Sequence, residues 1–273
     1  MPWAHRRPSV PATTAAVCAV LTLGVPAAAG ESHGGSAGAA GAPSGTAPGA
    51  VPRALTPAQS ACVSALNKQL LTSQRVGQLL WVGLDASAAP SGADALVRKY
   101  ALGGVVLLGG YHDGVAATRV TTDHVKALAD PRVRMVVAAD QEGGYVQQLQ
   151  GSGISTMPTA YYQGRNYSQA TLLAQTTKWG RQIADAGVNV NLAPVADTVS
   201  KAFMPYNKPI GYYQRNYDYV ADRVATDVTT VIAGMHAGGV GATAKHFPGL
   251  GRVTGNTDTT TCLLYTLRCR RRG

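Results

Sequence analysis

Several features that would assign a function directly are missing from this 273-residue sequence. No glycine-rich dinucleotide or phosphate-loop fingerprint follows any predicted strand, which argues against nucleotide binding of those kinds. None of the four cysteines has metal-ligand spacing with histidine or with another cysteine. No apolar run beyond the first thirty residues has the length of a membrane helix. We therefore expect no metal, no cofactor and no membrane insertion of the mature protein.

Acidic residues are also scarce, with 14 Asp and Glu against 24 Lys and Arg, so the net charge is +10. Much of this excess lies near the ends of the chain, including four arginines in the last six residues. Between residues 55 and 261 there are 17 basic and 13 acidic residues, which leaves a net charge of +4. No basic stripe is interleaved with aromatic residues, and we therefore expect no nucleic-acid partner.

The two ends of the chain differ from its middle. Residues 1–30 have a basic start, an apolar run from Val10 to Val25 and small residues for cleavage, which predicts a secretory signal peptide and a secreted protein, extracellular or associated with the cell wall. Residues 31–54 are rich in Gly, Ala, Ser and Pro and predict a flexible linker. Residues 262–273 form a basic tail without a strand-helix pattern, which we interpret as out-of-frame translation or a premature end.

Residues 55–261 alternate between strand and helix signals and predict one partial domain. Thr56 and Pro57 begin a first helix, a second short helix includes Arg75, and further helices are predicted at Asp94–Tyr100, Val115–Ala129, Thr171–Ala186 and Tyr219–Ala237. Apolar strands are predicted late in Val76–Leu84 and at Val105–Leu108, Arg134–Ala139, Val188–Pro194 and Val240–Ala244.

This alternation is typical of an α/β fold with a parallel sheet. It leaves two architectures open: a doubly wound open sheet, or a (β/α)8 TIM-type barrel that is incomplete, with about five of its eight strand-helix units. Trp81 and Trp179 are expected in the core.

Conspicuous polar residues directly follow the predicted strands: Asp113, Asp140 with Glu142, Asp197, and Lys245 with His246. A barrel places its active site at that end of its strands. Lys245 offers three donors and a charge, and His246 a donor or an acceptor. The carboxylates of Asp140 and Glu142 can accept hydrogen bonds from sugar hydroxyls, whereas Asp197 is expected to stabilise a strand end.

Seven motifs, in order from about residue 55 to residue 258, resemble glycoside hydrolase family 3, and within it the small single-barrel β-N-acetylglucosaminidase branch. The motifs are Arg75–Leu79, Leu102–Val105, Tyr111–Asp113, Asp140–Gly144, Asn191–Asp197, Pro209–Gly211 and Lys245–Gly249. The resemblance implies a (β/α)8 barrel that hydrolyses O-glycosidic bonds with retention. Its substrate would be terminal β-linked N-acetylglucosamine, or a similar sugar, in cell-wall or chitin-like oligosaccharides.

The resemblance also implies roles for individual residues. Asp113 would hold hydroxyls of the non-reducing sugar, and Lys245, His246 and Arg215 would bind the same sugar. Two arginines that the family usually carries after the paired glycines are replaced by Tyr145 and Gln148, which indicates an altered substrate preference. The segment between Gly211 and Arg215 is also longer than in the family.

The catalytic residues depart from the family pattern. The family's acid/base is a histidine in an Asp-Ser-His loop, and this chain has no histidine there. Counted without a gap from Lys245, Asp258 takes its place; counted with a small insertion, Asp258 falls on the aspartate and Thr260 on the histidine. A carboxylic acid can transfer this proton if a partly apolar site raises its pKa, whereas a threonine cannot, so Asp258 is the expected acid/base. No counterpart of the family's nucleophilic aspartate follows, so the alternative is an inactive, truncated fragment or pseudoenzyme that keeps part of a sugar-binding surface.

Overall fold

The computed structural model describes residues 55–259. The expected signal peptide, linker and basic tail, together with Thr260, lie outside the described residues. The helices and strands, in chain order, are α1 (Pro57–Gln69), α2 (Thr72–Gly77), β1 (Trp81–Asp85), the 3₁₀ turn η1 (Pro90–Ala93), α3 (Asp94–Tyr100), β2 (Gly104–Leu108), α4 (Gly114–Lys126), β3 (Val136–Ala139), β4 (Gln141–Gly143), β5 (Val146–Gln147), α5 (Ala160–Asn166), α6 (Gln169–Asp185), β6 (Val190–Asn191), α7 (Ala221–Ala237) and β7 (Gly241–Ala242).

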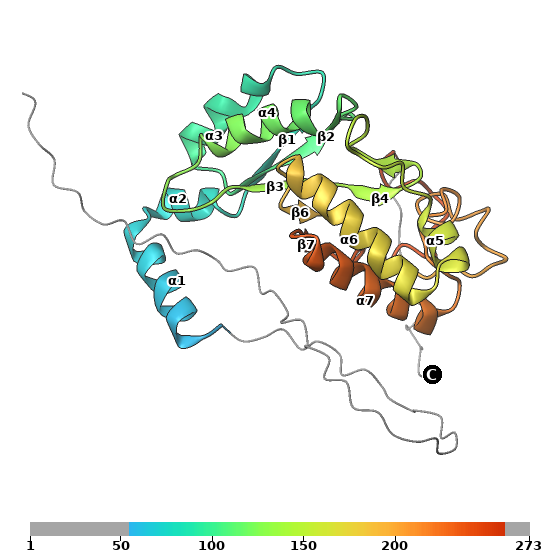
Figure 1. The fold of residues 1–273 in the computed structure, drawn as a ribbon. Coiled ribbons are helices and arrows are strands. Elements are labelled where there is room, and N and C mark those ends of the chain that lie inside the picture. The colour runs from blue at the N-terminus through green and yellow to red at the C-terminus, as the bar shows by residue number, and fades with distance from the viewer. Residues whose placement is uncertain (1–54, 260–273) are drawn as a thin grey trace, which may run out of the picture.

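Five strands form one parallel sheet in the order β1-β2-β3-β6-β7, and successive strands lie side by side (Figure 1). All five predicted strands are present, and the helices α3, α4, α6 and α7 follow one another around the sheet. Sequential parallel strands with intervening helices are the arrangement of a (β/α)8 barrel rather than of a doubly wound sheet, whose strand order reverses. The predicted fold class, an incomplete TIM-type barrel, is confirmed.

The burial of each strand follows its place in the sheet. The inner strands β2 and β3 are largely buried, as their continuous apolar sequences predict, although Leu108 at the end of β2 is exposed. The outer strand β1 has a strand neighbour on one side only among the described residues, and its Trp81 is 42% exposed. The prediction of a core Trp81 is therefore wrong, whereas Trp179 on α6 is buried at 3% exposure, as predicted.

Helices α6 and α7 lie side by side along one side of the molecule (Figure 1). Their close approach depends on glycine, because a Cβ on Gly234 would lie 1.9 Å from Thr176 Oγ1 and one on Gly238 would lie 2.7 Å from the Cα of Gly180. Of the helices in residues 55–259, none combines the length and the apolar character that crossing a membrane would require.

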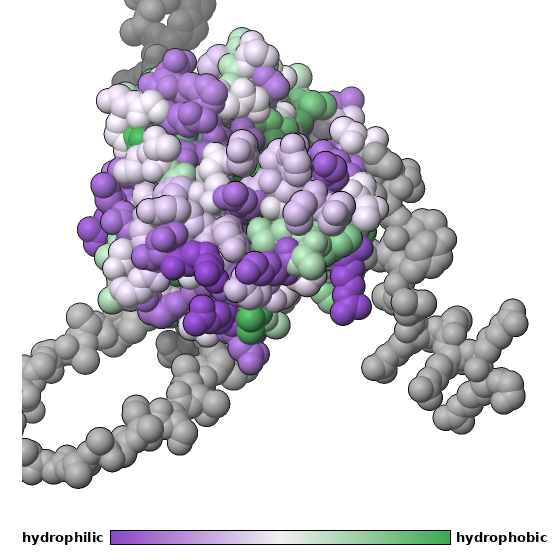
Figure 2. Space-filling model, turned by 90° about the vertical axis from the view of Figure 1, so that its right-hand side faces the viewer, coloured by the Kyte–Doolittle hydropathy of each residue, from purple (hydrophilic) through white to green (hydrophobic). Residues whose placement is uncertain are grey.

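The sequence analysis did not predict the 3₁₀ turn η1, nor the strands β4 and β5 and the helix α5, which all lie between β3 and α6. The antiparallel pair β4–β5 begins one residue after Asp140, and α5 follows it. A long connection without regular strands joins β6 to α7. Figure 2 shows the face on the right of Figure 1, where hydrophilic and weakly polar residues predominate and hydrophobic patches are small and separate.

Tyr111, in the loop between β2 and α4, allows a test of how this loop packs against β1. Its hydroxyl donates to Leu84 O at 3.1 Å, and burial, with a smaller effect from Asp85, raises the pKa of Tyr111 to about 12. Tyr111→Phe is expected to lower the free energy of unfolding by about 1 kcal/mol at pH 8. Because the unfolded chain loses this proton at about pH 10, the advantage of tyrosine should shrink as the pH rises from about 10 towards 12.

The measurement is urea unfolding of wild type and variant at pH 8 and pH 11, with Tyr206→Phe as the control because Tyr206 is exposed. If wild type and Tyr111→Phe differed in free energy of unfolding by the same amount at both pH values, the pKa of Tyr111 would not be raised in the folded chain.

Candidate active site

Lys245 and His246 lie just beyond β7, where pairing with the chain after β6 continues. Lys245 N donates to Pro194 O at 3.1 Å, and Ala196 N donates to Lys245 O at 2.6 Å. The Lys245–His246 peptide bond is cis. These bonds hold both residues at the carboxyl end of the sheet, which is where the sequence predicts the site.

The ammonium group of Lys245 joins two carboxylates that follow β3. Lys245 Nζ contacts Asp140 Oδ1 and lies 2.6 Å from Glu142 Oε1. Asn191 on β6 fixes the intervening residue, because its side-chain amide exchanges two hydrogen bonds of 3.1 Å with the backbone of Gln141. The structure thus brings together Asp140 and Lys245, two of the predicted substrate-binding residues.

Arg215, a third predicted residue, reaches the same cluster through Glu142. Its Nε and Nη2 each donate to a different oxygen of Glu142 at 2.8 Å, and Nη1 donates to Pro209 O at 2.7 Å. The side chain of Glu142 is 3% exposed. Burial raises the pKa of Glu142, but the hydrogen bonds from Arg215 and the charge of Lys245 together outweigh it and leave the pKa below its usual value.

Glu142 therefore stays ionised and holds two cations in place. We call Asp140, Glu142, Arg215 and Lys245 the Lys245 cluster. Sequence reasoning gave Glu142 no role of its own beyond that of a possible hydroxyl acceptor. Its only signal was its place two residues after Asp140 in a glycine-rich motif at a strand end.

The loop that carries Arg215 is anchored by Asn207, which is fully buried. The Asn207 amide donates to Leu250 O and Val253 O, both at 2.8 Å, and its side-chain oxygen accepts from the backbone of Ile210 and Gly211. One side chain thus connects the Arg215 loop with the loop that follows His246.

His246 is held by a different carboxylate, that of Asp197. Its Nδ1 lies 2.6 Å from Asp197 Oδ2, its backbone N–H donates to the same oxygen at 3.3 Å, and Leu250 N donates to Oδ1. The Asp197 side chain has no exposed surface. It accordingly stabilises the end of this strand, as predicted, and leaves His246 Nε2 as the ring atom that can face a ligand.

The remaining predicted residues are not joined to the Lys245 cluster. Asp113 is exposed at the start of α4 and caps no backbone N–H of that helix with its side chain. Asp258 is exposed in a turn, where its backbone N–H donates to Asn256 Oδ1 at 3.0 Å. Within residues 55–259, no hydrogen bond or ion pair links either aspartate to Lys245, so their predicted roles stay predictions.

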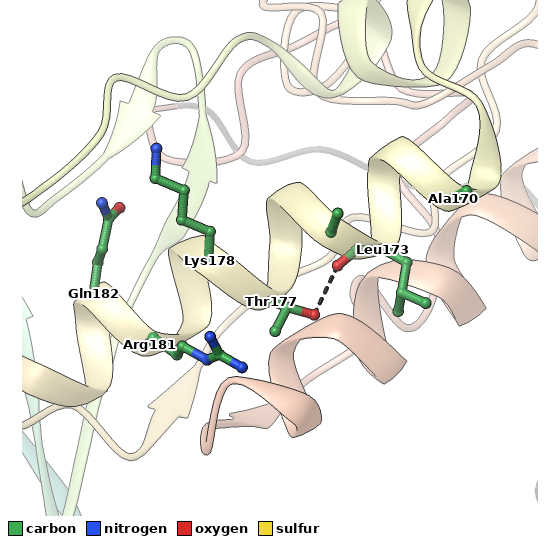
Figure 3. A pocket seen from close by; sticks show the side chains of 7 residues that line it. Ala170, Leu173, Thr177, Lys178, Arg181 and Gln182 are labelled. Carbon is green, nitrogen blue, oxygen red and sulfur yellow. Dashed lines mark hydrogen bonds between the residues drawn. The ribbon is translucent and has the colours of Figure 1, made fainter. Parts of the chain in front are cut away.

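A separate hollow lies on the outer surface of α6 (Figure 3). Its described lining comes from this one helix, and it includes Leu173, Lys178 and Arg181 but no predicted site residue. Among residues 55–259, no group of three or more His, Cys, Asp or Glu side chains is arranged to hold a metal ion.

The Lys245 cluster and His246 suit the binding of a polyhydroxylated ligand. Lys245 and Arg215 offer charged donors, Asp140 is a partly exposed acceptor, and His246 adds a ring nitrogen. Such mixed donors and acceptors can hold adjacent sugar hydroxyls, each of which both donates and accepts.

Comparison with known proteins identifies the family of this chain. The model for the N-terminal domain of glycosyl hydrolase family 3 matches residues 71–265. The chain belongs to this family. A curated β-hexosaminidase of Stenotrophomonas maltophilia is 33% identical over 193 residues, which cover 68% of this chain and 54% of the relative.

Solved structures agree with this family membership. The β-N-acetylhexosaminidase of Beutenbergia cavernae is 44% identical, with a TM-score of 0.68 over 70% of this chain and 58% of that chain. LpqI of M tuberculosis is 25% identical, with a TM-score of 0.59 over 71% of this chain and 53% of that chain. This family 3 chain spans about half the length of the curated relatives it matches.

Proposed function

We propose that the protein is a retaining β-N-acetylglucosaminidase-type glycosidase that cleaves terminal β-linked sugars from cell-wall or chitin-like oligosaccharides. The observation that carries this proposal is the Lys245 cluster at the carboxyl end of a parallel sheet, in a chain that belongs to a glycosidase family. Lys245, Arg215, His246 and Asp140 bind the terminal sugar, and Asp113 holds its outer hydroxyls.

Asp258 is the proposed acid/base, which protonates the oxygen of the leaving sugar. Retention also requires a second carboxylate about 5–5.5 Å from the acid. Glu142 and Asp197 have both oxygens occupied by hydrogen bonds, and Asp140 is paired with Lys245. None of these three carboxylates is therefore assigned as the nucleophile.

This arrangement favours a second candidate function, a sugar-binding fragment without turnover. Such a fragment would keep the Lys245 cluster and His246, and Asp258 would have no catalytic role. The two candidates differ in one measurable respect, because both bind a terminal sugar but only the enzyme cleaves it.

The deciding experiment compares hydrolysis of a chromogenic β-N-acetylglucosaminide and of N,N′-diacetylchitobiose by the full chain and by Asp258→Ala. Loss of a general acid should slow the reaction by about 10²–10⁴-fold. The loss should be larger for chitobiose, whose leaving sugar needs protonation. Asp185→Ala, which changes an exposed acid on α6, is the matched control.

Turnover that Asp258→Ala leaves intact would remove Asp258 from the mechanism. A folded chain that binds N-acetylglucosamine without cleaving either substrate would establish the binding-only function instead.

We further propose that the protein acts outside the cell, because residues 1–30 have the composition of a signal peptide. A reporter fused to these residues should be exported, and retention of the reporter in the cytoplasm would refute the proposal.

A further inference from the structure

Three tyrosines from two separate loops gather next to the Lys245 cluster. Tyr145 lies in the turn between β4 and β5, and Tyr212 and Tyr213 lie in the loop before Arg215. The rings of Tyr145 and Tyr213 meet edge to face with centroids 5.7 Å apart, and those of Tyr213 and Tyr212 do so at 5.0 Å. Edge-to-face contact at such distances is a favourable arrangement of aromatic rings, so the three side chains form one unit.

This tyrosine unit is exposed although aromatic side chains usually gain from burial. Tyr145 is 75% exposed and Tyr212 is 53% exposed. Tyrosine has an apolar ring and a polar tip, which makes it suited to contact a ligand that is partly apolar and partly hydrophilic. An exposed group of rings beside a candidate site indicates an extension of that site.

The position of the unit is fixed by the Lys245 cluster itself. Tyr145 follows Glu142 by three residues, and Tyr213 precedes Arg215 by two. Since Glu142 and Arg215 form a bidentate ion pair, the two loops are tied together within a few residues of Tyr145 and Tyr213. The length of the chain therefore keeps the Cα of Tyr145 within about 11 Å of the Cα of Glu142, and the Cα of Tyr213 within about 7 Å of the Cα of Arg215.

Contacts with the chain around Thr159 also support the two loops that carry the tyrosines. Gln214, between Tyr213 and Arg215, has a left-handed backbone with φ of 55°. Its backbone oxygen accepts from Tyr161 N at 3.1 Å, and its side-chain oxygen accepts from Thr159 Oγ1 at 3.1 Å. Gly144 packs closely against Thr159 as well, because a Cβ on Gly144 would lie 2.4 Å from Thr159 Cγ2. A loop backbone that is already held in place reduces the entropy lost when a ligand binds.

We propose that Tyr145, Tyr212 and Tyr213 form a binding platform for the second sugar ring of the substrate, the ring on the leaving side of the scissile bond. The proposal rests on the proposed function, in which the Lys245 cluster holds the terminal sugar. A pyranose ring has C–H groups on its faces and hydroxyls at its edges, which matches the faces and hydroxyls of these tyrosines. Lys208, whose Nζ lies 4.2 Å from the Tyr212 ring centroid, supplies a donor at the outer end.

The test measures binding of N-acetylglucosamine and of the S-linked analogue of N,N′-diacetylchitobiose, which resists hydrolysis, to the full chain by NMR titration. The wild type should bind the disaccharide more tightly than the monosaccharide. Tyr145→Ala and Tyr213→Ala should each weaken disaccharide binding about tenfold and change monosaccharide binding less than about twofold. Tyr206→Ala, which changes an exposed tyrosine outside the unit, should change neither.

A second readout needs no variant, because the ring resonances of the three tyrosines should shift on addition of the disaccharide and not of the monosaccharide. Equal affinity of the wild type for the two sugars, or equal weakening of both by the tyrosine variants, would overturn the platform while leaving the proposed function intact. A wild type that binds neither sugar would overturn both.

Discussion

Glu142→Ala is expected to lower the free energy of unfolding by about 3–5 kcal/mol, the usual cost of removing one partner of a buried ion pair. The carboxylate is 3% exposed and Arg215 is 15% exposed, so the guanidinium would lose its bidentate partner in a largely dry environment. Lys245 would lose one of its two carboxylates as well. Urea unfolding of the variant and the wild type at pH 7 measures the difference.

Asp123→Ala is the matched control, because it breaks the exposed ion pair between Asp123 and Arg119. Exposed pairs contribute about 1 kcal/mol or less, so this variant should be nearly neutral. A loss in Glu142→Ala no larger than that of the control would mean that Glu142 does not hold the cluster together.

The same carboxylate should give the stability a dependence on pH. Because the pKa of Glu142 is lower in the folded chain than its usual value of about 4.3, the folded state favours the ionised form. The stabilisation is therefore present above about pH 4.3 and is lost as the pH falls through the folded value. The difference in stability between the wild type and Glu142→Gln should shrink between pH 5 and pH 3, and a constant difference would contradict the assignment.

The sheet could be predicted because its strands carry their signal locally. Val105–Leu108 and Val136–Ala139 are short apolar runs that end at glycine or aspartate, and such runs are typical of strands buried on both faces. The pair β4–β5 has no comparable signal, because apart from Val146 it is made of polar residues and glycine. The prediction of a buried Trp81 is wrong for a related reason, since a sequence does not show that its strand lies at the edge of the sheet formed by residues 55–259.

The candidate site was partly predictable for the same reason. Asp140 and Lys245 are separated by 105 residues, but each follows a strand, and parallel strands bring their carboxyl ends together. Arg215 belongs to no strand and was found only through the resemblance to family 3. Its partner Glu142, 73 residues away, follows from the course of an irregular loop that no periodicity encodes.

The adjacent residues Lys245 and His246 are held by two separate buried carboxylates, which gives each side chain its own anchor. Glu142 holds Lys245 from the β3 side, and Asp197 holds His246 from the β6 side. Removal of each carboxylate should therefore disturb a different part of the site. Loss of Glu142 should disturb Arg215 and Lys245 together, whereas loss of Asp197 should release His246 and the loop after it.

Asp197→Ala is accordingly expected to lower the free energy of unfolding by about 3 kcal/mol, because three donors lose their acceptor. Asp197→Asn is the matched variant, since its side-chain oxygen can still accept from Leu250 N and should recover part of the loss. Urea unfolding gives the stabilities, and hydrogen exchange at Leu250 shows whether the loop has opened. If Asp197→Ala unfolded like the wild type while Leu250 stayed protected, Asp197 would not be the anchor of His246, and the loop would depend on Asn207 alone.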